Sequence, residues 1–309
     1  MPKNIFITGI SGCVGHYLFD YIATDHENSY YFLVRNAKKL LFDYKSRKNI
    51  QIIEDDLRNI SKYGDLLNNI NCLIHIAPDW GSIDGNLDYT IKLFDLLDLN
   101  RCEKVIYFST ASILGPDNRP NEIAEKCGTP YIRGKYLMHK KLREMKISDR
   151  TIVLFPTWVL GGDNKHPYSH ATLAIKSFIK YLSFLRFFKV DVSFHFIHAK
   201  DIAMITYYLL KSDAKNGELV LGNDMITFYR ITKEICSYFH KRIYFQLPIS
   251  DKFVSFAAKL VGRKLSGWDK YCLKNRHQVY KVVNCRTFAI ESNLTTFNGI
   301  LDDIIITCN

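Results

Sequence analysis

The sequence predicts an α/β protein built on a doubly wound parallel sheet, and three observations support this prediction. Short apolar runs rich in β-branched residues alternate with segments of helical period through the first half of the chain. A glycine-rich turn directly follows the first of these runs. The chain has 309 residues, of which 47% are hydrophobic, and this is enough to bury a large core. Strands and helices that alternate in this way form a parallel sheet with helices on both faces.

The predicted elements of the first half follow in chain order. Strands are expected over residues 4–8, 30–34, 50–54, 72–77 and 104–108, because each is an apolar run of strand length. A helix is expected over residues 14–23 and an amphipathic helix over residues 87–97, because apolar side chains recur there at helical spacing. Each predicted strand therefore lies one crossover away from the next.

The turn after the first predicted strand has the pattern of a dinucleotide-binding site. It reads Thr-Gly-Ile-Ser-Gly-Cys-Val-Gly over residues 8–15. Its three glycines allow a tight turn, close approach of a pyrophosphate and packing of the helix on the sheet. The helix N-terminus then offers free N–H groups and a positive dipole end to the phosphates. In this Rossmann-type fold, the residues expected to bind the dinucleotide are Gly9, Ser11, Gly12, Cys13, Val14 and Gly15.

The end of the second predicted strand bears on which dinucleotide is bound. An NAD site commonly has an acid about twenty residues after the glycines, which accepts a hydrogen bond from the ribose 2′-hydroxyl. Residues 33–36 here read Leu-Val-Arg-Asn, with Arg35 and no carboxylate. A guanidinium suits a 2′-phosphate, so NADP is the expected cofactor and NAD the alternative. The simpler interpretation of Arg35 is an exposed arginine at a strand end.

The second half of the chain is less regular. Strands are expected over residues 151–155 and 193–197, and a helix that returns to the sheet over residues 200–210. The domain division predicted from this pattern is a dinucleotide-binding domain at 1–160, an insertion at 161–194, a return to the sheet at 195–223 and a last region at 224–309. We expect the insertion and the last region to form a smaller, discontinuous substrate region.

Further segments resemble, in order, the extended short-chain dehydrogenase/reductase family, which is also described as NAD-dependent epimerase/dehydratase. The likeness extends from Ile5 to about Leu221. Residues 55–57 resemble the adenine-contacting segment, residues 74–77 the fourth strand, and Asn86 with Thr90 a structural Asn-x-x-x-Thr helix. Residues 108–115 resemble the strand that carries the catalytic serine or threonine, and residues 196–203 a later segment that leads into a helix. The cofactor contacts that the resemblance adds are Asp56, Leu57, Ala77 and Pro156.

The same resemblance implies a catalytic Tyr-x-x-x-Lys pair at Tyr131 and Lys135, with Thr110 beside it. One helical turn brings the tyrosine and the lysine to one face. The ammonium would stabilise a tyrosinate, and the phenol would exchange a proton with a substrate oxygen while nicotinamide exchanges hydride. Thr110 would hydrogen-bond the same oxygen, and Lys135 would also hold the nicotinamide ribose.

The spacing of this pair is common in the chain. Four further tyrosines have a lysine four residues later, namely Tyr44, Tyr136, Tyr207 and Tyr229. Tyr131 is preferred because it follows Pro130 at an expected helix start and because the small Gly134 precedes its lysine. Tyr136 and a decayed site are the alternatives.

Residues 154–161 depart from the members of this family that act on sugar nucleotides. Phe155 and Trp158 occupy places where those members usually carry an arginine and an asparagine. We therefore expect reduction of a carbonyl, or oxidation of an alcohol, on a fairly apolar small molecule. The rival enzyme is a nucleotide-sugar epimerase or dehydratase. A non-catalytic nucleotide-binding assembly or regulatory protein is the alternative from a different class.

Composition limits the partners and the compartment. The net charge of +11 favours anionic partners, the dinucleotide first, and no nucleic-acid-binding motif accompanies it. Eight cysteines without a Cys-x-x-Cys pair predict reduced thiols, and hence the cytoplasm or a reduced organelle interior. His166 and His170 lack a third nearby ligand, so no metal site is expected. No membrane-spanning helix or secretory signal is expected, and a homodimer is left open.

A stretch over residues 176–189 mixes aromatic with basic side chains. Its apolar members are Phe178, Tyr181, Phe184, Leu185, Phe187 and Phe188, and its basic members are Lys176, Lys180, Arg186 and Lys189. The favoured interpretation is a core-facing stripe with solvated lysines. The alternatives are a substrate pocket or a surface that contacts a membrane or a protein partner. Residues 259–281 repeat this mixture.

Overall fold

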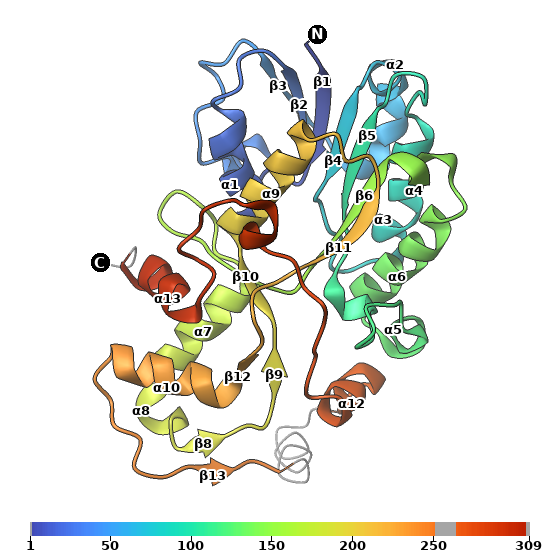
Figure 1. Cartoon of the computed structure of the whole chain (residues 1–309). Coiled ribbons are helices and arrows are strands. Elements are labelled where there is room, and N and C mark those ends of the chain that lie inside the picture. Colours follow the sequence, from blue (N-terminus) through green and yellow to red (C-terminus); the bar gives the residue numbers. More distant parts are fainter. Residues whose placement is uncertain (1, 251–263, 307–309) are drawn as a thin grey trace.

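The computed structural model describes residues 2–250 and 264–306, and its central feature is a seven-stranded parallel sheet (Figure 1). The strand order is β11-β6-β5-β4-β1-β2-β3. The strands are β1 (Asn4–Thr8), β2 (Ser29–Val34), β3 (Ile50–Glu54), β4 (Cys72–His75), β5 (Lys104–Phe108), β6 (Thr151–Pro156) and β11 (Gly217–Leu221). All neighbouring pairs run parallel. The predicted α/β fold with a doubly wound parallel sheet is confirmed.

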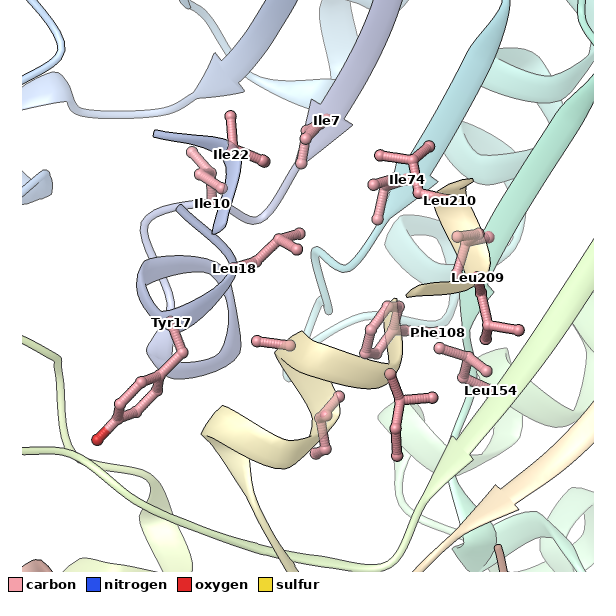
Figure 2. Close-up of a cluster of buried hydrophobic side chains, with 14 of the residues drawn as sticks. Ile7, Ile10, Tyr17, Leu18, Ile22, Ile74, Phe108, Leu154, Leu209 and Leu210 are labelled. Carbon is pink, nitrogen blue, oxygen red and sulfur yellow. The ribbon is translucent and has the colours of Figure 1, made fainter. Parts of the chain in front are cut away.

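Helices cover both faces of the sheet, which explains why its strands are apolar on both sides. On one face, Ile7, Ile74 and Phe108 pack with Leu18 of α1 (Cys13–Ile22) and Leu209 of α9 (Ala199–Lys211) (Figure 2). Neighbouring residues of the same strands face the other layer. That layer contains α4 (Asp88–Asp95) and α6 (Pro130–Leu142).

Short elements connect these layers. They are α2 (Gly64–Leu67), α3 (Ile83–Asn86), α5 (Glu122–Cys127) and the 3₁₀ turns η1 (Ala37–Lys39), η2 (Leu57–Tyr63), η3 (Ala111–Ile113), η4 (Lys146–Arg150) and η5 (Cys285–Phe288). Polar side chains begin several of them. Asn121 Oδ1, for example, accepts a hydrogen bond from the N–H of Ile123 at the start of α5 (3.0 Å).

A smaller region lies below the sheet in Figure 1. Its helices are α7 (His170–Lys180), α8 (Leu182–Leu185), α10 (Phe228–Tyr238), α12 (Gly267–Lys274) and α13 (Phe297–Ile306). Its strands are β7 (Trp158–Leu160), β8 (Phe188–Lys189), β9 (Ser193–Phe194), β10 (Phe196–His198), β12 (Ile226–Thr227) and β13 (Leu247–Pro248). The strands pair as β10 with β7, β12 with β9 and β13 with β8. A separate apolar core, which includes Leu182, Ile235 and Ile300, holds this region together.

The structure differs from the sequence-based expectations mainly in this smaller region. The strand expected over residues 193–197 is divided into β9 and β10, which pair with different partners. None of the six apolar members of the basic aromatic stretch is fully buried, so a core-facing stripe describes it only in part. Tyr181 and Phe184 are exposed, and the other four are half-buried. Within residues 2–250 and 264–306, no helix is both long and apolar enough to cross a bilayer. Residues 259–263 of the second basic apolar stretch lie outside the described residues.

Candidate active site

A cavity of about 760 Å³ opens at the carboxyl ends of β1, β2 and β4. In the sheet, β1 lies between β4 and β2, so the chain crosses to opposite sides of β1 at this point. Such a switch in strand order leaves a crevice in which α/β proteins bind ligands. The cavity lining includes seven of the expected cofactor residues, namely Gly9, Ser11, Gly12, Arg35, Asp56, Leu57 and Ala77.

The glycine turn brings the backbone up to this cavity. Gly9 has φ +82°, and a Cβ there would lie 2.5 Å from the backbone N of Ala77. A Cβ on Gly15 would lie 2.5 Å from the carbonyl oxygen of Gly9, so Gly15 allows α1 to pack against the turn. Gly12 precedes α1, and the first N–H groups of that helix have no intrahelical acceptor. The turn therefore offers N–H donors at the cavity and fits a bound pyrophosphate.

The cavity lining does not include three of the expected cofactor residues near this turn, namely Cys13, Val14 and Gly15. Cys13 is the only one of the three whose side chain could act as a nucleophile. Val14 and Gly15 lie in the first turn of α1 beside it. Burial raises the pKa of the Cys13 thiol to about 12, so this side chain is a neutral thiol at physiological pH. Cys13 is thus a poor nucleophile.

Cations gather at the end of the cavity formed by β2 and η2. Arg35, Lys39 and Arg58 line it there. Asp56 Oδ1 accepts hydrogen bonds from the backbone N–H of Arg58 (2.9 Å) and from its Nε (3.0 Å). Among the described residues, Arg35 and Lys39 form no ion pair, and both are exposed. Asp55 and Asp56 also line this end, and the charge of Arg35 helps to lower the pKa of Asp56, so Lys39 and, in part, Arg35 are the cations available to an anionic ligand.

The structure brings Thr110 and Tyr131 together. Thr110 follows β5, and Tyr131 lies in the first turn of α6, which begins at Pro130 and is capped by Thr129. Burial raises the pKa of Tyr131 to about 12, and a hydrogen bond with the Thr110 side chain opposes this rise. The phenol is therefore protonated at neutral pH and lies within reach of the Thr110 hydroxyl.

Lys135 lies one turn further along α6 and is fully buried. Its Nζ donates a hydrogen bond to the carbonyl oxygen of Phe108 (2.7 Å) and lies 4.8 Å from the centre of the Tyr107 ring. Burial lowers the pKa of Lys135 to about 7. No described hydrogen bond joins this ammonium to Tyr131. The lysine is instead anchored to the strand that carries Thr110.

Close packing of α6 against α3 positions the helix that carries Tyr131 and Lys135. A Cβ on Gly134 would lie 2.8 Å from the Cβ of Asn86 and 2.9 Å from the carbonyl oxygen of Ile83. Asn86 also holds the loop after β4. Its Nδ2 donates to the carbonyl oxygens of Asp79 and of Ser82 (3.0 Å), and its Oδ1 accepts from the N–H of Asp79 (3.1 Å).

Trp80, in this loop, is a site residue that the sequence analysis did not identify. Its ring lies 4.4 Å from the ring of Tyr131 and 5.1 Å from that of His170, the first residue of α7. It also lines the cavity and is 58% exposed. A tryptophan placed directly after the fourth strand was the available signal. The alternative tyrosine, Tyr136, is buried in the core between α6 and the sheet.

A second, small cavity of about 40 Å³ lies beside Thr110. It is lined by Ala111, Ser112, Pro156, Thr157, Trp158, Phe194, His195, Gln278 and Tyr280. Trp158 and Phe194 stack with ring centres 4.7 Å apart. His195 lies between two backbone groups, with Nδ1 2.8 Å from the Asn223 carbonyl oxygen and Nε2 accepting from the N–H of Tyr280 (3.1 Å). Pro156, expected at the cofactor, thus lies at this second cavity, whose lining contains no lysine or arginine.

Comparison with known proteins identifies the family. Residues 5–222 match the model of the NAD dependent epimerase/dehydratase family. The uncharacterized protein MJ1055 of Methanocaldococcus jannaschii is 25% identical in an alignment 144 residues long that covers 38% of this chain and 42% of that protein. This chain thus matches less than half the length of that relative.

Solved structures share the whole fold. The UDP-N-acetylglucosamine 4-epimerase of Methanobrevibacter ruminantium, in complex with UDP-N-acetylmuramic acid, has a TM-score of 0.68 at 18% identity and covers 100% of this chain and 99% of its own. The dTDP-glucose 4,6-dehydratase of Bacillus anthracis, in complex with NAD, has a TM-score of 0.69 at 14% identity and covers 98% of this chain and 96% of its own. The resemblance inferred from the sequence is confirmed. This chain belongs to the NAD dependent epimerase/dehydratase family.

Proposed function

We propose that this protein is an NADP-dependent oxidoreductase that interconverts a carbonyl and an alcohol on an apolar small molecule. The observation that carries the proposal is the meeting of Thr110 and Tyr131, with Lys135 anchored one helical turn away. A protonated phenol beside a hydroxyl is suited to donate a proton to a carbonyl oxygen.

The residues of the large cavity fit a dinucleotide. Gly9, Ser11 and Gly12, together with the N–H groups that begin α1, would hold the pyrophosphate, and Cys13, Val14 and Gly15 would support that turn. The adenosine half of the dinucleotide would contact Asp56 and Leu57, and the nicotinamide half would contact Ala77. When bound, the dinucleotide supplies hydride chemistry. Arg35 and Lys39, which pair with no described carboxylate, support NADP over NAD because a 2′-phosphate needs cationic partners.

In the reductive direction, Tyr131 would give its proton to the substrate oxygen as negative charge develops there, and Thr110 would hydrogen-bond the same oxygen. In its protonated form Lys135, held one turn along α6, would favour the resulting tyrosinate through its positive charge, and its pKa near 7 would let it exchange a proton close to physiological pH. Trp80 covers the Tyr131 ring and would limit the access of water to the phenol.

The aromatic side chains near Thr110 support an apolar substrate, although the cavity of about 40 Å³ between them holds about one water and would have to widen to admit one. Trp158 and Phe194 stack there, and no lysine or arginine lines this cavity among the described residues, whereas the diphosphate of a nucleotide sugar would require cationic partners. The rival activity, nucleotide-sugar epimerisation or dehydration, is favoured by one finding, which is that the structural relatives act on UDP- and dTDP-sugars.

Redox stoichiometry separates the two activities. The purified protein is incubated with NADPH and apolar ketones and aldehydes, and separately with NAD and UDP- or dTDP-sugars. We expect stoichiometric loss of NADPH absorbance with formation of an alcohol. Conversion of a nucleotide sugar without net change in the dinucleotide would overturn the proposal in favour of the rival enzyme. Dinucleotide binding without turnover of either substrate class would favour a non-catalytic role.

A further inference from the structure

A third cavity, of about 610 Å³, lies in the smaller region next to α10 and β8, at the end of the molecule opposite the sheet (Figure 1). Three lysines line it, namely Lys189, Lys233 and Lys241, and three aromatic rings, those of Tyr229, Tyr244 and Phe245. Among the described residues, its lining contains no acidic side chain. The cavity shares no residue with either cavity of the candidate active site.

The positive charge of this cavity is uncompensated. None of its three lysines pairs with a carboxylate anywhere in the described part of the chain, and the nearby acid on α10, Glu234, is bound to Arg230 (2.7 Å). Arg186 adds a further positive charge. Its carbonyl oxygen accepts a hydrogen bond from Gln246 of the cavity (3.0 Å), and its Nε is buried without an acceptor among the described residues. Such a cluster of like charges repels itself and attracts an anion.

Exposed apolar side chains surround the cavity. Tyr244 is 73% exposed, Phe245 57% and Leu247 54%. Phe245 stacks on Phe187 (4.9 Å), and Leu247 pairs in register with Phe188. The apolar surface therefore continues from the cavity onto the two-stranded ribbon of β8 and β13.

The ribbon connects this surface with α8. Phe188 packs against Phe184, with ring centres 5.0 Å apart, and Phe184 is itself 66% exposed. Large exposed apolar side chains in contact with one another mark a surface that is covered by a partner. Lysines beside such a surface indicate that this partner is anionic as well as apolar.

We propose that this face binds an anionic phospholipid bilayer, with lipid phosphate in the cavity of Lys189, Lys233 and Lys241 and with Phe184, Tyr244 and Phe245 at the boundary between headgroups and acyl chains. A bilayer uses both features, because lysine stems lie along apolar surface while their ammonium groups reach the phosphates. Aromatic side chains are also favoured at this depth. A nucleic acid would satisfy the lysines but would leave Phe184 and Leu247 in water. The proposal does not depend on the proposed enzymatic function.

Vesicle sedimentation tests the proposal with the full-length protein. The lipids are phosphatidylcholine alone and phosphatidylcholine with about 30% phosphatidylserine. We expect the protein to sediment with the anionic vesicles at low salt, to stay in solution with the neutral ones, and to be released in part at about 0.5 M salt. Sedimentation with both lipids alike, or with neither, would overturn the proposal.

Two variants locate the contact. Lys189→Glu/Lys233→Glu/Lys241→Glu should lower the partition coefficient at least about 100-fold, because each lysine near an anionic surface contributes about fivefold and each new carboxylate adds repulsion. Tyr244→Ser/Phe245→Ser should lower it about tenfold and leave the remaining binding more sensitive to salt. Unchanged melting temperature and dinucleotide affinity would show that both variants fold.

The matched control is Lys48→Glu/Lys92→Glu/Lys215→Glu, which changes net charge equally at exposed positions elsewhere. It should retain most of the vesicle binding. An equal loss in this control would mean that net charge alone attracts the protein, and the proposal would fail. Lysine-dependent binding of a single-stranded RNA, with no binding to vesicles, would identify nucleic acid as the partner and would equally reject a bilayer.

Discussion

Replacement of Lys135 by methionine should stabilise the protein while it abolishes activity. The side chain is 1% exposed, and burial lowers its pKa from 10.5 in the unfolded chain to about 7. That difference is about 3 to 4 pKa units, and each unit corresponds to about 1.4 kcal/mol. The penalty on the folded state is therefore on the order of 5 kcal/mol below pH 7. Loss of the hydrogen bond to Phe108 offsets about 1 kcal/mol of the gain, because a buried carbonyl loses its donor.

The pH dependence identifies the cause. Between pH 7 and pH 10.5 the unfolded chain holds a proton on Lys135 that the folded chain has lost, so the stability of the wild type rises with pH across this window. The variant lacks this slope. Its advantage in free energy of unfolding should be largest below pH 7 and should shrink towards pH 10. Urea denaturation of both proteins at several pH values measures this difference. A lower stability of Lys135→Met at pH 6 would refute the reasoning.

Three further predictions concern the proposed site. Tyr131→Phe should lower kcat about 10²–10⁴-fold with unchanged dinucleotide affinity, while the core residue Tyr136, changed to Phe, should be nearly silent in the same steady-state assay; the reverse ranking would move the active site. Arg35→Asp should weaken NADPH binding about 10–100-fold by fluorescence titration and NADH binding little, and an equal loss for both would contradict the NADP assignment. Gly134→Ala should cost about 1–3 kcal/mol in urea denaturation, because its Cβ meets Asn86 and the Ile83 backbone; an unchanged or higher stability would show that α6 moves away at no cost.

Local patterns predicted the sheet well. The observed bounds of β1, β3 and β5 agree with those expected, because each strand is an apolar run with polar or turn residues at its ends. The pairing of β9 and β10 is different. Their partners β12 and β7 lie far away in the chain, and His195, the residue between β9 and β10, is held by the backbone of Asn223 and Tyr280. A contact between distant residues leaves no periodic signal along the chain.

In the candidate site, too, features set by local sequence could be predicted and features set by contacts between distant residues could not. The glycine turn could be predicted because its function requires particular residues at short spacing. Lys39 and Arg58 could not, because only the fold brings their loops to the cavity. The contact of Lys135 with the Phe108 carbonyl also depends on the distance between α6 and β5, which a helical repeat does not encode.

The position of Trp80 has a consequence for how this protein can change during evolution. Its ring contacts Tyr131 on the sheet side and His170 at the start of α7, so one loop side chain connects the two regions of the chain. A substitution at any of these three positions alters the packing of the other two. We therefore expect residues 80, 131 and 170 to vary together among related sequences. Lineages in which the smaller region changes for a new substrate would have to keep the contacts among these three side chains or replace all three together.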